Sequence, residues 1–134
     1  MKRSMLVRDY MVESPLTFEP GMDILSAAHA LIKRGVGSAP VLDINGWPIG
    51  IITEQDCIAV ALQSYYHGTP GGIVSDRMTA NPKTVGADDS IFDAAQKFVK
   101  NKFHGYPVVT DDGYLVGLLR RSDVLRAMGE FYPR

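Results

Sequence analysis

The sequence has little cysteine, no excess of charge of either sign and no long apolar run. Its 134 residues include one cysteine and carry 14 basic against 15 acidic side chains, a formal net charge of −1. A single cysteine excludes an internal disulfide, and a near-neutral chain without a basic stripe disfavours nucleic-acid binding. No segment is apolar enough to span a bilayer, and no signal core follows the basic N-terminus. We therefore expect a cytoplasmic protein with no membrane insertion.

The side chains that most catalytic and metal sites require are also few or scattered. The three histidines, at positions 29, 67 and 104, do not gather with Cys57, so we expect no metal site. No Ser/His/Asp set and no pair of carboxylates is evident, so we expect no enzyme. Cys57 falls in an apolar helical run and is expected to be a buried packing residue. The composition, 46% hydrophobic and 22% charged, is that of a globular chain.

What the sequence does contain is an internal repeat. A shift of 67 positions aligns residues 7–56 with residues 74–123 without a gap, and 14 of the 50 pairs are identical. Such a period indicates a repeated supersecondary unit. A half of about 60 residues would bury only a marginal core alone, so we expect the halves to form one pseudo-twofold body. The predicted domains are 1–66 and 74–134, joined by a linker over 67–73.

Each half predicts the same order of elements. A short helical turn and an extended entry at Ser14-Pro15 or Asn81-Pro82 lead to a three-residue strand. An amphipathic helix, a proline-containing strand, an Asn-Gly or Asp-Gly turn, a return strand and a final helix follow. Proline lacks an N–H group, so its strand should lie at an edge or miss one ladder bond. This order predicts an α+β fold in which helices cover small sheets. The predicted strands and helices of the two halves are Leu16–Phe18 and Lys83–Val85, Asp23–Gly35 and Ser90–Asn101, Ser38–Leu42 and Gly105–Val109, Ile49–Ile52 and Leu115–Leu119, and the runs from Glu54 and from Arg121.

The most specific motif joins the return strand to the final helix. It reads Gly50–Asp56 in the first half and Gly117–Asp123 in the second: a glycine, two apolar residues and an aspartate six positions after the glycine. In the first half the aspartate resembles part of a capping box, with Thr53 as the helix cap. It also suits a ligand, because helix-start N–H groups attract phosphate and an ionised carboxylate accepts ribose hydroxyls. The glycine would give a flat ring access to the backbone. The readings are compatible.

With these motifs the chain resembles a tandem pair of CBS (cystathionine-β-synthase-type) domains, a Bateman module. The resemblance covers residues 6–128 and rests on the Asp-x-Met starts, the Pro-Val strands, the Asn/Asp-Gly turns and the paired glycine–aspartate strings. It implies two repeats packed about a pseudo-twofold axis, with clefts for adenosine-containing ligands such as AMP, ADP, ATP, S-adenosylmethionine or NAD. It also implies a regulatory homodimer rather than a catalyst.

The resemblance assigns site residues by position in each repeat. The first cleft would use Thr53 and Asp56 for ribose and phosphate, and its base pocket would be lined by Thr17, Ser38, Ala39 and Pro40. The second cleft would use Thr84, Gly105, Tyr106, Pro107, Arg120 and Asp123. Arg120 departs from the pattern, because the family usually has serine or threonine there. It could grip a phosphate, fill the cleft or pair with an acidic side chain such as Asp123.

Two functions follow from the resemblance. The first is a signalling module that senses an adenosine-containing ligand, AMP, ADP or ATP foremost, and acts on a separate protein in trans. The alternative is a ligand-free scaffold that uses the same fold for homodimerisation or protein docking. Binding of an adenine ligand discriminates the two.

Overall fold

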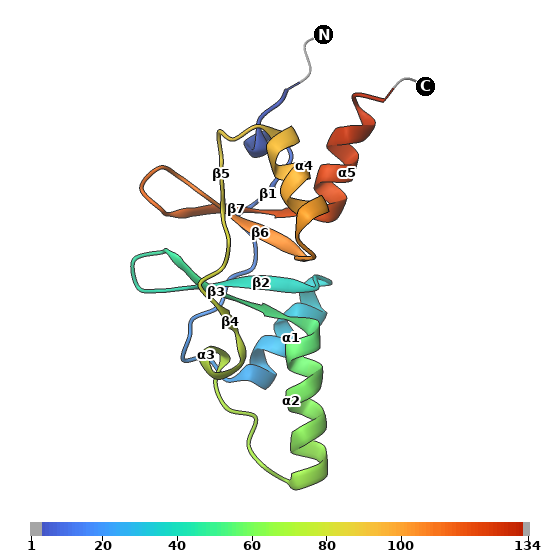
Figure 1. Ribbon diagram of the computed structural model, residues 1–134. Coiled ribbons are helices and arrows are strands. Elements are labelled where there is room, and N and C mark those ends of the chain that lie inside the picture. The colour runs from blue at the N-terminus through green and yellow to red at the C-terminus, as the bar shows by residue number, and fades with distance from the viewer. Residues whose placement is uncertain (1–3, 133–134) are drawn as a thin grey trace. The chain divides into compact units, whose positions relative to one another are not determined.

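The computed structural model describes residues 4–132. The described part of the chain contains helices and short strands (Figure 1), and the predicted α+β class is confirmed. In chain order the elements are η1 (Val7–Asp9), β1 (Val12–Glu13), α1 (Ile24–Arg34), β2 (Ser38–Leu42), β3 (Pro48–Thr53), α2 (Glu54–His67), α3 (Val74–Arg77), β4 (Thr79–Ala80), β5 (Val85–Gly86), α4 (Ile91–Lys100), β6 (Gly105–Val109), β7 (Leu115–Arg120) and α5 (Arg121–Gly129). Every described helix is too short or too polar to cross a membrane.

The chain divides into two compact units whose borders differ from the borders of the repeat. One unit, here the middle unit, is Leu16–Pro82. The other, the terminal unit, joins the described residues up to Pro15 to those from Lys83 onward. The opening segment of each repeat therefore packs with the body of the other repeat. The ranges 1–66 and 74–134 remain the predicted units of duplication.

The middle unit packs two helices on a three-stranded antiparallel sheet with strand order β2-β3-β4. Helix α1 begins after Asp23, whose carboxylate accepts the N–H of Ser26 at 3.0 Å, and ends at Gly35 in the left-handed conformation. Helix α2 lies beside α1 and follows β3 directly (Figure 1). Its core consists of Phe18, Ile24, Ala27, Leu31, Ala39, Val41, Ile52, Cys57, Val60 and Val74. Cys57 is buried there, as predicted.

The terminal unit repeats this plan with a four-stranded sheet of order β1-β7-β6-β5. Helix α4 begins after Ser90, whose hydroxyl accepts the N–H of Phe92 at 3.1 Å. The opening segment of the first repeat, up to Pro15, is called here the exchanged N-terminal segment. It forms part of this unit, because β1 pairs with β7 and Val7 is fully buried. Its core consists of Val7, Tyr10, Val85, Ala87, Ile91, Ala94, Tyr106, Val108, Leu119, Val124 and Ala127.

The structure corrects the predicted strands in two places. The three-residue strands expected at Leu16–Phe18 and Lys83–Val85 shrink to a single bridge from Phe18 to Val41 and to β5. Strands β1 and β4 were not predicted at all, since two residues are too few for a period-two pattern. The proline prediction is confirmed: β2 is an edge strand, and β5 pairs with β6 only at Val108 and Val109, beyond Pro107.

Candidate functional site

In the middle unit Thr53 and Asp56 form a closed capping box at the start of α2. The Asp56 carboxylate accepts the Thr53 backbone N–H and the Thr53 hydroxyl, both at 2.9 Å from Oδ2. The Thr53 hydroxyl in turn accepts the Asp56 N–H at 3.3 Å. The capping interpretation is therefore confirmed. Both accepted bonds fall on Oδ2, and among residues 4–132 no partner occupies Oδ1, which leaves acceptor capacity on a half-buried carboxylate.

The other predicted residues of the first site belong to the same unit: Ser38, Ala39 and Pro40 lie on β2, whereas Thr17 is linked to β2 only through its neighbour Phe18. Ser38 lies directly opposite Thr53 in the β2–β3 ladder, and the Pro40 carbonyl accepts the N–H of Phe18 at 3.0 Å. Thr17, next to Phe18, lines an open hollow of about 760 Å³ in this unit. Ala39 and Pro40 are buried, so these two positions offer mainly backbone and strand edge to a ligand.

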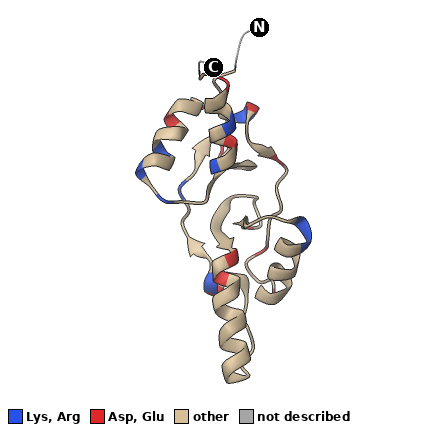
Figure 2. Cartoon of the chain, turned by 90° about the vertical axis from the view of Figure 1, so that its right-hand side faces the viewer, with Lys and Arg blue, Asp and Glu red and all other residues tan. Residues whose placement is uncertain are grey.

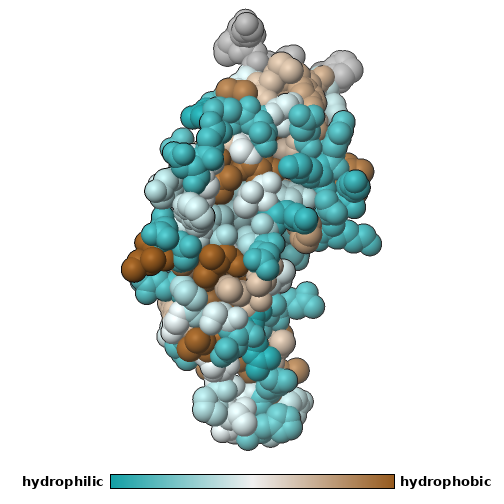
Figure 3. Space-filling model, turned by 60° about the vertical axis from the view of Figure 1, so that its left-hand side comes forward, coloured by the Kyte–Doolittle hydropathy of each residue, from teal (hydrophilic) through white to brown (hydrophobic). Residues whose placement is uncertain are grey.

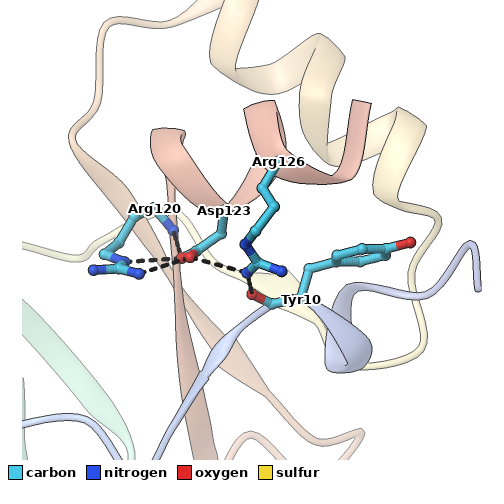
Figure 4. Close-up of polar contacts among 4 residues, drawn as sticks. All are labelled: Tyr10, Arg120, Asp123 and Arg126. Carbon is cyan, nitrogen blue, oxygen red and sulfur yellow. Dashed lines mark hydrogen bonds and ion pairs between the residues drawn. The ribbon is translucent and has the colours of Figure 1, made fainter. Parts of the chain in front are cut away.

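The corresponding carboxylate of the terminal unit, Asp123, is fully engaged. Arg120 donates its backbone N–H and Nε to Oδ2, each at 2.9 Å, and its Nη2 to Oδ1 at 2.7 Å (Figure 4). Arg126 adds a longer contact to Oδ1 at 3.4 Å. Of the roles left open for Arg120, the described structure shows the pair with Asp123. The arginine side chain has no hydrogen-bond acceptor, so it cannot accept the Asp123 N–H in the way that the Thr53 hydroxyl accepts the Asp56 N–H.

Burial and charge act in opposite directions on Asp123. The residue is only 1% exposed, and burial alone would raise the pKa of its carboxyl. The hydrogen bonds from Arg120 outweigh burial, so the pKa of Asp123 lies below its ordinary value. Asp123 is therefore an ionised, paired carboxylate at neutral pH.

Arg126 also connects α5 to the exchanged N-terminal segment, a connection that the sequence did not predict. Arg126 donates to the Tyr10 carbonyl at 3.0 Å, and its guanidinium carbon lies 5.9 Å from the centre of the Tyr10 ring (Figure 4). The Tyr10 hydroxyl donates to Glu130 at 2.5 Å. This hydrogen bond, with burial, raises the pKa of Tyr10 to about 12. Residues 10 and 126 are too distant in sequence for any local pattern to have joined them.

The remaining predicted residues of the second site lie around β6. Gly105 is paired with Arg120 in the β6–β7 ladder, and Pro107 is buried. Tyr106 is 1% exposed and its hydroxyl donates to the Lys97 carbonyl at 3.2 Å, so its ring belongs to the core. Thr84 is half-buried at the entry to β5.

The two glycines of the paired strings have a packing role that the sequence did not suggest. A Cβ on Gly50 would lie 2.3 Å from the sulfur of Met78, and one on Gly117 would lie 2.4 Å from the sulfur of Met11. Each glycine is thus covered by the methionine of the Asp-x-Met start of the other repeat, because that opening segment packs in the unit of the glycine. The interpretation that these glycines admit a ligand ring is wrong on the side where a Cβ would project.

Two further features bear on the chemistry available. No cluster of three or more His, Cys, Asp or Glu residues that could hold a metal ion occurs within residues 4–132. Burial and the carboxylates of Asp56 and Glu54 raise the pKa of the Cys57 thiol, which disfavours the reactive thiolate.

Comparison with known proteins gives the same family for both repeats. The profile of the CBS domain matches residues 7–62 and 74–130. The crystal structure of CBSX2 in complex with AMP is similar at a TM-score of 0.83 and 31% identity, covering 96% of this chain and 98% of that one. The CBS domain pair of protein MJ0100, in complex with 5′-methylthioadenosine and S-adenosyl-L-methionine, is similar at a TM-score of 0.82 and 29% identity, covering 96% and 100%.

The curated relatives are longer and are similar to this chain over only part of their length. An L-aspartate semialdehyde sulfurtransferase of Methanocaldococcus jannaschii is 33% identical over 92% of this chain, which spans 23% of that protein. The chloroplastic CBS domain-containing protein CBSX2 of Arabidopsis thaliana is 28% identical over 81% of this chain, which spans 56% of it. The chain thus spans about half or less of these two relatives.

Proposed function

The chain belongs to the CBS domain family, and on that premise we propose that it is a regulatory module that binds an adenosine-containing ligand. The single observation that carries the proposal is that Oδ1 of Asp56 receives no hydrogen bond from any residue between 4 and 132, in an otherwise closed capping box. A ribose presents two adjacent hydroxyl donors, which an ionised carboxylate accepts. Two similar structures, one in complex with AMP and one with S-adenosyl-L-methionine and 5′-methylthioadenosine, support the same ligand class.

The proposed binding residues are those of the middle unit. Thr53 and Asp56 contact the ribose and phosphate, while Thr17, Ser38, Ala39 and Pro40 line the base pocket. The N–H groups of Glu54 and Asp56 in the first turn of α2 are already bonded, to the Gly37 carbonyl and to the Thr53 hydroxyl, so the helix dipole is what favours a phosphate at this N-terminus. AMP, ADP and ATP are the first candidates. The module acts by a difference in ligand affinity between two of its states, with its output passed to a partner protein in trans rather than through catalysis of its own.

Ligand binding is tested by thermal unfolding and calorimetry with AMP, ADP, ATP, NAD, S-adenosylmethionine and a guanine nucleotide as control. A ligand at about 100 times its dissociation constant adds about 2.7 kcal/mol, which raises the melting temperature on the order of 10 °C for a chain of this size. Asp56→Ala is expected to weaken binding by about 1.5–3 kcal/mol, the worth of a hydrogen bond to a charged group. Absence of binding by every adenine compound would refute the sensor proposal and favour the scaffold.

The helical faces support a homodimer as the form in which the module works. Ile32 on α1 is 78% exposed and Ile58 on α2 is 65% exposed, beside an apolar hollow of about 220 Å³. The repeat places Val99 and Leu125 at the equivalent positions of the terminal unit, and they are 89% and 65% exposed. Beyond its first turn α2 carries no Lys, Arg, Asp or Glu and is drawn without charge in Figure 2. Burying both apolar faces against a second copy would remove this surface from water.

The dimer is tested by light scattering after size exclusion. Ile58→Glu combined with Leu125→Glu is expected to convert a dimer to a monomer, because each subunit would bury two unpaired charges at the interface. Ile44→Glu is the matched control, because Ile44 is fully exposed and lies in the turn between β2 and β3. On the face drawn in Figure 3, apolar side chains form small patches among polar ones. A monomeric wild-type chain, or dissociation by the control, would contradict the assignment.

A further inference from the structure

We infer that the Arg120 side chain blocks the second predicted site by pairing with Asp123. Each chain then binds one ligand, at Asp56, and not two. The inference rests on the proposed function and decides which of the two repeats performs it. It starts from one difference between aligned positions: Thr53 in the first repeat corresponds to Arg120 in the second, while Asp56 and Asp123 are identical.

The difference changes what each carboxylate can accept. Asp56 receives both of its hydrogen bonds on Oδ2. Asp123 receives four contacts, which fall on both oxygens and come from the Arg120 backbone, the Arg120 guanidinium and Arg126 (Figure 4). A ribose hydroxyl needs a free lone pair in an accessible direction, and Asp123 is 1% exposed against a half-buried Asp56. The Asp123 carboxylate therefore has neither a free lone pair for a ribose hydroxyl nor a surface that a ligand can reach.

A ligand at the second predicted site would have to replace the hydrogen bonds from Arg120 to Asp123 with weaker ones from its own hydroxyls. A ligand hydroxyl is a neutral donor, whereas Arg120 supplies a two-bond fork of opposite charge at 2.9 and 2.7 Å. Arg126 holds the same carboxylate while bonded to the Tyr10 carbonyl, so moving Asp123 also disturbs the exchanged segment. The internal pair consequently outcompetes a ribose at this position.

The reciprocal exchange of the two aligned residues tests this directly. Arg120→Thr restores the Thr-x-x-Asp pattern and is expected to raise the calorimetric stoichiometry from one adenine ligand per chain to two. Thr53→Arg is expected to weaken the first site by more than about tenfold, since its guanidinium would take Asp56. The double variant should again bind one ligand, now lost with Asp123→Ala and not with Asp56→Ala. Arg120→Ser is a second variant should Arg120→Thr fold poorly.

Each outcome separates this inference from the sensor proposal. Wild-type binding of one ligand with two in Arg120→Thr supports both. Wild-type binding of two ligands, or of one in both proteins, overturns the role of Arg120 and leaves the sensor intact. Weaker total binding in Arg120→Thr would make Arg120 a phosphate ligand and also overturns the inference. If neither protein binds any adenine compound, both proposals fall.

Discussion

Replacing Asp123 with alanine is expected to lower the free energy of unfolding by about 3 kcal/mol, whereas Asp56→Ala is expected to cost about 1 kcal/mol. The two residues occupy the same position of the repeat, so each variant is the control for the other. Asp56→Ala removes a helix cap. Asp123→Ala removes charge-assisted bonds from Arg120 and the contact that orients Arg126 toward Tyr10. Because both arginines are about half exposed, water partly restores them, which keeps the cost below that of a fully buried pair.

Urea unfolding at neutral and acid pH measures this contribution. The folded pKa of Asp123 is lowered, so its stabilisation is present above the ordinary carboxyl pKa and is lost as the pH falls from there through the folded pKa. The difference between wild type and Asp123→Ala should therefore shrink in that acid range. Asp123→Asn keeps the shape without the charge and should fall between the two. Equal losses from Asp123→Ala and Asp56→Ala would contradict the assignment.

Stability and ligand binding should rank these two aspartates in opposite order. Asp56 has a free acceptor and a modest structural role, whereas Asp123 is committed to its arginines. Asp56→Ala is thus expected to lose ligand with little loss of stability, and Asp123→Ala to lose stability while still binding.

The second large effect is expected at Gly117, where alanine should cost about 3 kcal/mol against about 1 kcal/mol for Gly50→Ala. A Cβ at position 117 would lie 2.4 Å from the Met11 sulfur and also 2.9 Å from the Val12 carbonyl oxygen of the paired strand β1. At position 50 the three nearest atoms all belong to the Met78 side chain. A methionine side chain can change rotamer, but a ladder backbone must separate to relieve the clash.

Denaturant unfolding of single and double variants distinguishes the two situations. Adding Met78→Ala to Gly50→Ala should cost less than the sum of the single changes, because the clash disappears with the side chain. Adding Met11→Ala to Gly117→Ala should recover little, since the Val12 carbonyl remains. Full recovery at Gly117 would show that the methionine alone, and not the β1 backbone, sets the cost.

Sequence reasoning was most successful where the signal was local. Helix starts at Asp23, Thr53 and Ser90 were predicted from capping side chains and apolar spacing, and the structure has them. The hairpins were predicted from the Asn-Gly and Asp-Gly turns. The two-residue strands β1 and β4 were not predicted, because they form only by pairing with residues far along the chain.

The sequence by itself determined the duplication, the α+β class, the family and the pair of aspartates at equivalent helix starts. These depend on periodicity and on contacts within a few residues, which a linear pattern records. Only the tertiary structure decided the exchange of the opening segments, the methionines over the glycines and the commitment of Asp123 to Arg120 and Arg126. The sequence left three roles open for Arg120: binding a phosphate, filling the cleft or pairing with an acidic side chain such as Asp123. Which role it takes depends on burial and side-chain geometry, which exist only once the chain is folded.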